Sequence, residues 1–142
     1  LTLTWLLPSN LATWAVLIAW MWLAPHSMHL IFVAMFISGI GDALAEPVGL
    51  LLGKNPYRTR ALWTDRTYIR TLEGSAVVLA SGVVAVFLTY GFQLTNTQML
   101  LALLTFPIVG AAAEAKSPHT WDQPFIVASC AMVAIVITFL SP

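Results

Sequence analysis

The sequence predicts an all-α, polytopic integral membrane protein: a bundle of about five transmembrane helices. Of its 142 residues, 59% are hydrophobic and only 8% are charged, whereas about a quarter of a soluble domain is charged. Apolar runs that approach the roughly 20 residues needed to cross a bilayer recur along the chain. The six acids and six bases cancel to a net charge of zero. No overall field therefore favours nucleic acid, and we expect no nucleic-acid partner.

The apolar runs define the expected membrane segments in order. The first covers residues 3–24, and its closing tryptophans, Trp20 and Trp22, suit a membrane interface. The other segments cover residues 29–52, 74–92, 99–113 and 125–140, and polar loops lie at residues 53–73 and 114–124. No internal repeat divides the chain, so we expect one transmembrane domain over residues 1–142.

The bases predict the orientation of these segments. All six lie in the two polar loops, and none lies after the first or third segment. Threading the segments brings both loops to one face, which the positive-inside rule makes cytoplasmic. Either these bases only determine topology or they also belong to a site. Since the chain opens with Leu1 and almost no polar lead-in, we expect it to be part of a longer protein.

Two acids interrupt the apolar second segment. Asp42 and Glu46 are four residues apart, so they project from one face of a helix. Two close carboxylates repel each other unless a cation or basic side chains lie between them. Mg²⁺ held by these acids and by substrate phosphates would relieve the repulsion; alternatively, the pair faces water or nearby arginines. Pro47 is expected to kink or interrupt the helix.

Small residues recur beside these acids at four-residue spacing, at Gly41, Ala45, Gly49 and Gly53. Such a stripe lets another helix approach closely, or it lets a nucleotide lie on the backbone. We expect helix packing at Gly41 and Ala45. Gly49 and Gly53, nearer the basic loop, are candidates for ligand contact.

The loop over residues 53–73 carries five cations, which suit a di- or triphosphate. They suit anionic lipid headgroups equally well. The following helix starts near Thr71, Gly74 and Ser75. Its free N–H groups favour phosphate; alternatively, Thr71 is a plain N-cap with Glu73 in the first turn.

The second polar loop adds two acids to the same face. Glu114 ends the fourth segment, where a carboxylate opposes the helix dipole. It can hold a metal or position an attacking hydroxyl. Asp122 can do either, or it can cap the fifth segment. His119 can titrate near neutral pH, although a lone loop histidine is more often simply solvated.

Taken together, these motifs resemble the CTP-dependent polyprenol kinase family, which includes dolichol kinase, phytol kinase and bacterial members described as phosphatidate cytidylyltransferase-like. The resemblance covers roughly residues 38–124. It is carried by Asp42, Ala45, Gly49, Gly53 and Lys54, then by Arg70-Thr71-Leu72-Glu73-Gly74-Ser75, then by Glu114 and Asp122. The chain departs from the family pattern with Arg70 in place of Lys, with Gln123 in place of Asn, and with an added Glu46-Pro47 that suggests a bacterial branch.

The resemblance implies a polytopic enzyme that transfers a phosphoryl group from CTP to a long-chain isoprenoid alcohol and uses Mg²⁺. It implies that Asp42 and Glu73 hold the metal and the triphosphate, and Glu46 is a further candidate metal ligand. Lys54, Arg58 and Arg70 would clamp phosphate oxygens, and Gly49, Gly53, Thr71, Gly74 and Ser75 would border the nucleotide. Glu114 or Asp122 would orient or deprotonate the alcohol. The expected location is a bacterial inner membrane, or an equivalent membrane, with the site facing the cytoplasm.

Three other functions remain open. A cytidylyltransferase making a CDP-activated lipid would use the same CTP, Mg²⁺ and membrane, and its product would be pyrophosphate rather than CDP. A transporter would carry ionisable groups near the bilayer midplane, often in related repeats. In a non-catalytic membrane subunit, the acids and bases would form a structural salt-bridge network.

Overall fold

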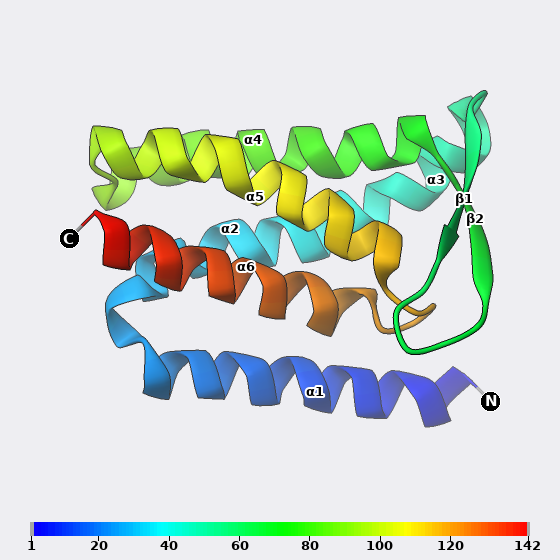
Figure 1. Ribbon diagram of the computed structural model, residues 1–142, viewed down its shortest axis with the longest axis horizontal. Coiled ribbons are helices and arrows are strands. Elements are labelled where there is room, and N and C mark those ends of the chain that lie inside the picture. The colour runs from blue at the N-terminus through cyan, green and yellow to red at the C-terminus, as the bar shows by residue number, and fades with distance from the viewer. Residues whose placement is uncertain (1, 142) are drawn as a thin grey trace.

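The long apolar runs of the chain form helices that lie side by side (Figure 1). The structure is a computed structural model and describes residues 2–141. A helix satisfies its own backbone N–H and C=O groups, which lipid cannot do. Within residues 2–141, five helical stretches are long and apolar enough to cross a membrane: Leu6–Leu23, Pro25–Leu52, Leu72–Thr89, Asn96–Lys116 and Asp122–Leu140. The predicted all-α membrane bundle is therefore confirmed. Residues 1 and 142 of the expected single domain lie outside the described part.

The second of these stretches is irregular. A 3₁₀ turn, η1 (Pro25–Leu30), leads into the short helix α2 (Ile31–Phe36), then into a π-helical segment, η2 (Ile37–Gly41), and then into α3 (Asp42–Leu52). The predicted interruption at Pro47 is not found there, because α3 continues through Pro47 to Leu52. The irregular geometry lies at η2, directly before Asp42, and π-helical turns of this kind are frequent at functional sites.

The other spans are regular helices: α1 (Thr2–Leu23), α4 (Leu72–Gln93), α5 (Asn96–Lys116) and α6 (Asp122–Leu140). Thr95 and Gln98 form a capping box that starts α5. The expected loop over residues 114–124 is shorter than predicted, because α5 runs on to Lys116 and α6 begins at Asp122. Glu114 therefore lies in the last turn of a helix.

The expected polar loop over residues 53–73 contains an antiparallel hairpin. Strand β1 (Pro56–Arg60) pairs with β2 (Thr67–Thr71), with Tyr57 opposite Arg70 and Arg58 opposite Ile69. The strands are rich in Thr and Tyr with one Ile, residue types enriched in strands. The hairpin crosses the end of the bundle rather than continuing the direction of the helices (Figure 1). Strand β1 therefore runs from α3 towards the end of α5, where Leu62 of the turn bonds to Lys116, and β2 returns to the start of α4.

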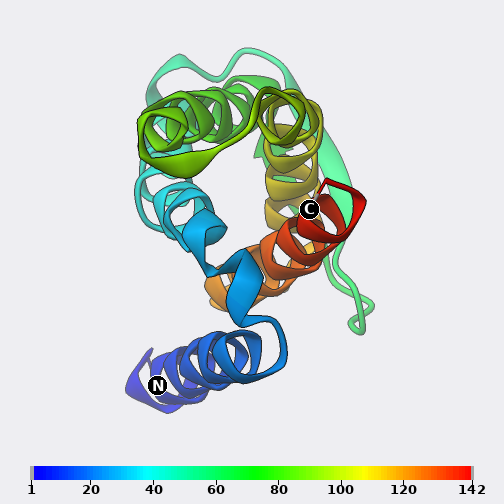
Figure 2. The ribbon, with the colours of Figure 1, turned by 90° about the vertical axis from the view of Figure 1, so that its left-hand side faces the viewer.

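The core lies between η2, α4, α5 and α6, where Ile37, Val78, Phe106 and Ile126 respectively are fully buried. Helix α1 lies outside the ring formed by the other helices (Figure 2). The elements that carry the six acids and six bases meet at one end of the bundle: the hairpin, α3, the start of α4, the end of α5 and the start of α6 (Figure 1). The expectation of a single charged end agrees with this arrangement.

Candidate functional site

A cavity of about 440 Å³ lies at the charged end of the bundle. Its walls come from α3, β2, the start of α4, the last turn of α5 and the start of α6. It is lined by Asp42, Ala43, Ala45, Glu46, Gly49, Leu50, Tyr68, Ile69, Arg70, Thr71, Gly74, Ser75, Glu114, His119 and Asp122. Most of the predicted site residues therefore share one cavity, although they are spread over 81 positions, from 42 to 122, of the sequence.

One wall carries the two acids of α3. Asp42 and Glu46 lie one turn apart on the same helix, and both line the cavity as the spacing predicted. The ion pairs among the described residues involve neither of them. Two neighbouring carboxylates that form no ion pair make this wall a favourable place for a cation.

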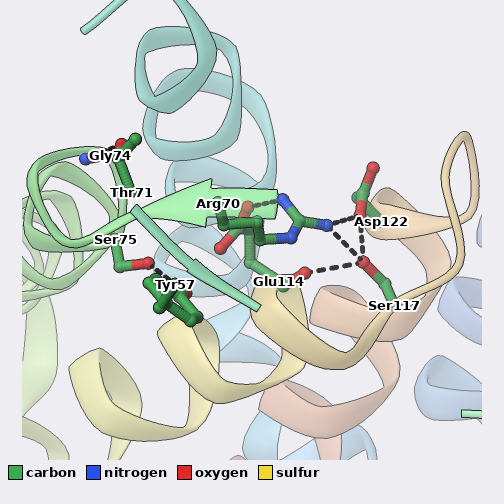
Figure 3. Close-up of polar contacts among 8 residues, drawn as sticks. All are labelled: Tyr57, Arg70, Thr71, Gly74, Ser75, Glu114, Ser117 and Asp122. Carbon is green, nitrogen blue, oxygen red and sulfur yellow. Dashed lines mark hydrogen bonds and ion pairs between the residues drawn. The ribbon is translucent and has the colours of Figure 1, made fainter. Parts of the chain in front are cut away.

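The opposite wall is organised around Arg70 of β2. Its Nη1 contacts Oε1 of Glu114, and its Nη2 donates to Oδ1 of Asp122 at 3.0 Å. Ser117 adds a hydroxyl within hydrogen-bonding reach of two acceptors, the same oxygen of Asp122 and the Glu114 carbonyl at 2.8 Å, and its one hydrogen can be donated to either. Figure 3 shows the guanidinium between the two carboxylates, with Ser117 beside Asp122. The network joins the hairpin to the end of α5 and the start of α6.

This network changes the role expected for Arg70. Two carboxylates already oppose its charge, so it is not a free phosphate clamp. Four carboxylates and one guanidinium line the cavity, which makes its walls acidic overall. Glu114 is only 3% exposed, and within the described residues its Oε2 and Nε of Arg70 have no hydrogen-bond partner. A bound group or water would satisfy these buried atoms.

The start of α4 forms a third wall. Oγ1 of Thr71 accepts a hydrogen bond from the backbone N–H of Gly74 at 3.1 Å, so Thr71 is the N-cap of α4. Ser75 shares a hydrogen bond of 2.7 Å with the hydroxyl of Tyr57 on β1 (Figure 3). Of the two roles predicted for Thr71, phosphate contact and N-capping, the structure shows N-capping. Thr71 nevertheless lines the cavity.

The glycines allow α3 to lie against the start of α4. A Cβ atom on Gly49 would come within 2.6 Å of Oγ1 of Thr71, and one on Gly74 would come within 2.8 Å of the Ala45 carbonyl oxygen. Gly53 lies against the Thr71 side chain and does not line the cavity. Close packing therefore explains these glycines directly, whereas Gly49 and Gly74 also border the cavity.

Four predicted site residues lie outside the cavity lining: Gly53, Lys54, Arg58 and Glu73. Glu73 instead accepts hydrogen bonds from the side chain of Asn55 at 2.8 Å and from its backbone N–H at 3.4 Å. Glu73 thus fastens the chain after α3 to the first turn of α4. The expected metal ligands Asp42, Glu46 and Glu73 are not brought together, and no cluster of three or more potential ligands occurs among residues 2–141.

Three site residues were missed by sequence reasoning. Tyr68 lines the cavity and its ring lies 6.2 Å from that of His119. Ser117 joins the Arg70 network, and Tyr57 holds Ser75. Along both segments the residue types alternate with a period of two, a pattern typical of strands. Pairing the two segments as a hairpin places Tyr57 opposite Arg70. No local pattern marks Ser117.

Comparisons of the chain with protein-family models, with curated proteins and with solved structures give no match.

Proposed function

We propose that the protein transfers the γ-phosphoryl group of CTP to a long-chain isoprenoid alcohol at this cavity, with Mg²⁺ as the metal. The observation that carries the proposal is a pair of carboxylates, Asp42 and Glu46, that form no ion pair among the described residues and line a cavity at the end of a membrane bundle. The same cavity gathers most of the motif residues that resemble the polyprenol kinase family, although Gly53, Lys54 and Glu73 lie outside it. By the positive-inside rule, we place this end in the cytoplasm, where CTP is available.

The donor set of this wall fits Mg²⁺. The ion binds through one or two carboxylates and completes its coordination with water and substrate phosphates. Asp42 and Glu46 supply such a pair, whereas Glu73, directed to Asn55, is not needed for it. When bound, Mg²⁺ would neutralise the charge of the triphosphate in an otherwise acidic cavity.

The rim of the cavity suits a lipid substrate. Leu50 and Ile69 both line it, and they are 80% and 70% exposed. The lining of the cavity thus has an exposed apolar part as well as a polar part. A water-soluble nucleotide would enter from the polar side, and the isoprenoid chain would lie along the apolar side.

In the proposed reaction, the alcohol oxygen forms a bond to the γ-phosphorus of CTP. The bond from that phosphorus to the bridging oxygen breaks, its electron pair leaves with CDP, and the alcohol proton passes to a carboxylate. Asp122 suits this role because both of its contacts, to Arg70 and to Ser117, use Oδ1 and leave Oδ2 for the proton. Phosphoryl transfer depends mainly on positioning and charge neutralisation, which these residues would provide.

The test uses the full chain in nanodiscs with Mg²⁺, CTP radiolabelled on the γ-phosphate, and a panel of isoprenoid alcohols. We expect label in an organic-phase lipid phosphate, together with CDP, and loss of both with Asp42→Asn. A matched control is Asp65→Asn, because Asp65 is a fully exposed acid of the hairpin turn outside the cavity.

A second arm separates the cytidylyltransferase. It uses phosphatidate and CTP labelled on the α-phosphate. Transfer of this label to lipid with release of pyrophosphate would show that the protein is a cytidylyltransferase rather than a kinase. Absence of either product from well-folded protein would leave the acids and bases as structural or transport groups.

A further inference from the structure

The turn of the hairpin, residues 61–66, extends beyond the helices of the bundle. Viewed along the helices, it projects past α6 to the outside of the ring (Figure 2). It is nevertheless fixed to the bundle. The backbone N–H of Leu62 donates to the carbonyl of Lys116 at 2.9 Å, and the ring of Trp63 lies 5.2 Å from that of Phe125.

The turn presents large apolar side chains to its surroundings. Trp63 is 88% exposed and Leu62 is 46% exposed. Trp63 has a φ of 63°, a left-handed conformation that bulky residues rarely adopt. Backbone strain of this kind persists where the surrounding structure imposes it, often at a functional position. At Trp63 this conformation leaves the indole exposed beside Phe125. Phe125 lies in the first turn of a candidate membrane span.

A polar hollow of about 470 Å³ accompanies this turn. It is lined by Arg60, Thr64, Asp65 and Lys116 as well as by the turn's apolar residues. Asp65 pairs with Arg60, but the ion pairs of the described part of the chain leave Lys116 uncompensated. Oγ1 of Thr64 is buried and, among the described atoms, has no hydrogen-bond partner. Arg66 is exposed at the end of the turn.

We propose that this turn binds the headgroup of an anionic phospholipid and anchors the hairpin to the membrane surface. Tryptophan favours the membrane–water interface, where its apolar ring and polar N–H are both accommodated. Lys and Arg close to the bilayer attract anionic headgroups. Lys116, Thr64 and Trp63 line the same hollow, so a basic group for the phosphate and an apolar ring for the acyl chain lie next to each other.

The level of the turn favours a lipid over a soluble anion. Phe125 lies in the first turn of the candidate span Asp122–Leu140, so the ring of Trp63 lies beside the end of that span, where a membrane interface is expected. Anchoring the turn would also help to position the cavity wall, because β2 continues from the turn directly to Arg70.

The experiment measures quenching of tryptophan fluorescence by brominated lipid in nanodiscs. Because the chain has six tryptophans, the signal of Trp63 is the difference between the unchanged protein and Trp63→Phe. Bromine is placed near the carbonyl end of the acyl chain of either phosphatidylglycerol or phosphatidylcholine. We expect this difference signal to be quenched by both lipids and more strongly by phosphatidylglycerol. Combining Lys116→Gln with Arg66→Gln should remove the preference and keep the quenching.

Trp22 provides a matched control, because it is 77% exposed at the end of the bundle that has no Lys or Arg. Its difference signal, from Trp22→Phe, should be quenched equally by the two lipids. Unquenched Trp63 emission, or equal quenching of Trp63 by both lipids, would overturn the proposal. Loss of the phosphatidylglycerol preference on adding inorganic phosphate or CTP would assign the hollow to a soluble anion instead.

Discussion

Arg70 and Glu114, which are 44 residues apart in the sequence, form an ion pair that joins the hairpin to the last turn of α5. The Glu114 side chain is only 4% exposed and that of Arg70 is 19% exposed. Asp122 shares the same guanidinium. One cation thus holds two acidic side chains of the cavity in place, so its removal should affect the fold as well as the site.

Arg70→Met should lower stability by about 3–5 kcal/mol, because it leaves the buried Glu114 carboxylate without its cation. The loss is read from the unfolding of the purified protein in detergent. Adding Glu114→Gln to Arg70→Met should recover part of it. The exposed pair is the control: Arg60→Met removes the partner of Asp65, and both side chains are mostly exposed, so the loss should stay below about 1 kcal/mol. Equal losses at Arg70 and Arg60 would contradict the structural role of the network.

Gly82→Ala should destabilise the bundle by about 1–3 kcal/mol, because added volume in a packed interface forces the backbone to shift. A Cβ atom at Gly82 on α4 would come within 2.8 Å of Cα of Pro107 on α5. Gly91 lies on the same helix, and a Cβ there would meet nothing within 4 Å. Gly91→Ala should therefore be neutral or stabilise by up to about 1 kcal/mol. Thermal unfolding of the two variants side by side measures the difference, and a loss at Gly91 as large as that at Gly82 would argue against this helix contact.

The membrane spans and the shared face of Asp42 and Glu46 could be predicted because both follow from local sequence. An apolar run of sufficient length specifies a span, and a spacing of four specifies a helix face. The single charged end then follows from threading the spans. None of these steps needs to know which helix packs against which.

The remaining features depend on contacts between distant residues. Arg70 looked like a phosphate clamp in sequence, because its partners Glu114 and Asp122 lie 44 and 52 residues away. Glu73 looked like a metal ligand, but Asn55, 18 residues earlier, takes its carboxylate. The sequence predicts a loop where the hairpin forms, since its short strands are mostly polar and gain their register only by pairing with each other.

If the proposed kinase activity holds, Asp42→Asn and Glu46→Gln should each lower kcat/KM on the order of a thousandfold, because charge neutralisation carries most of the catalysis in phosphoryl transfer. Glu73→Gln should lower it far less and should leave the Mg²⁺ concentration for half-maximal activity unchanged, since Glu73 is bonded to Asn55 outside the cavity. Initial rates are measured over a range of Mg²⁺ concentrations for all three variants. A strongly raised Mg²⁺ requirement in Glu73→Gln would return Glu73 to the metal site.

Two threonine N-caps at opposite ends of the bundle separate stability from function. Thr71 caps α4 at the cavity through the N–H of Gly74, and Thr95 caps α5 at the other end through the N–H of Gln98 at 3.2 Å. Thr71→Val and Thr95→Val keep the side-chain shape and remove the acceptor oxygen, so each should cost about 1 kcal/mol of stability.

Only Thr71 lines the cavity. If the proposed function holds, Thr71→Val should raise the KM for CTP and Thr95→Val should not. The expected rise is about tenfold, because one hydrogen bond to a charged phosphate is lost. Unfolding measurements and CTP titrations on both variants provide the comparison, and a similar rise in KM in Thr95→Val would mean that loss of stability, rather than contact with the nucleotide, causes the effect.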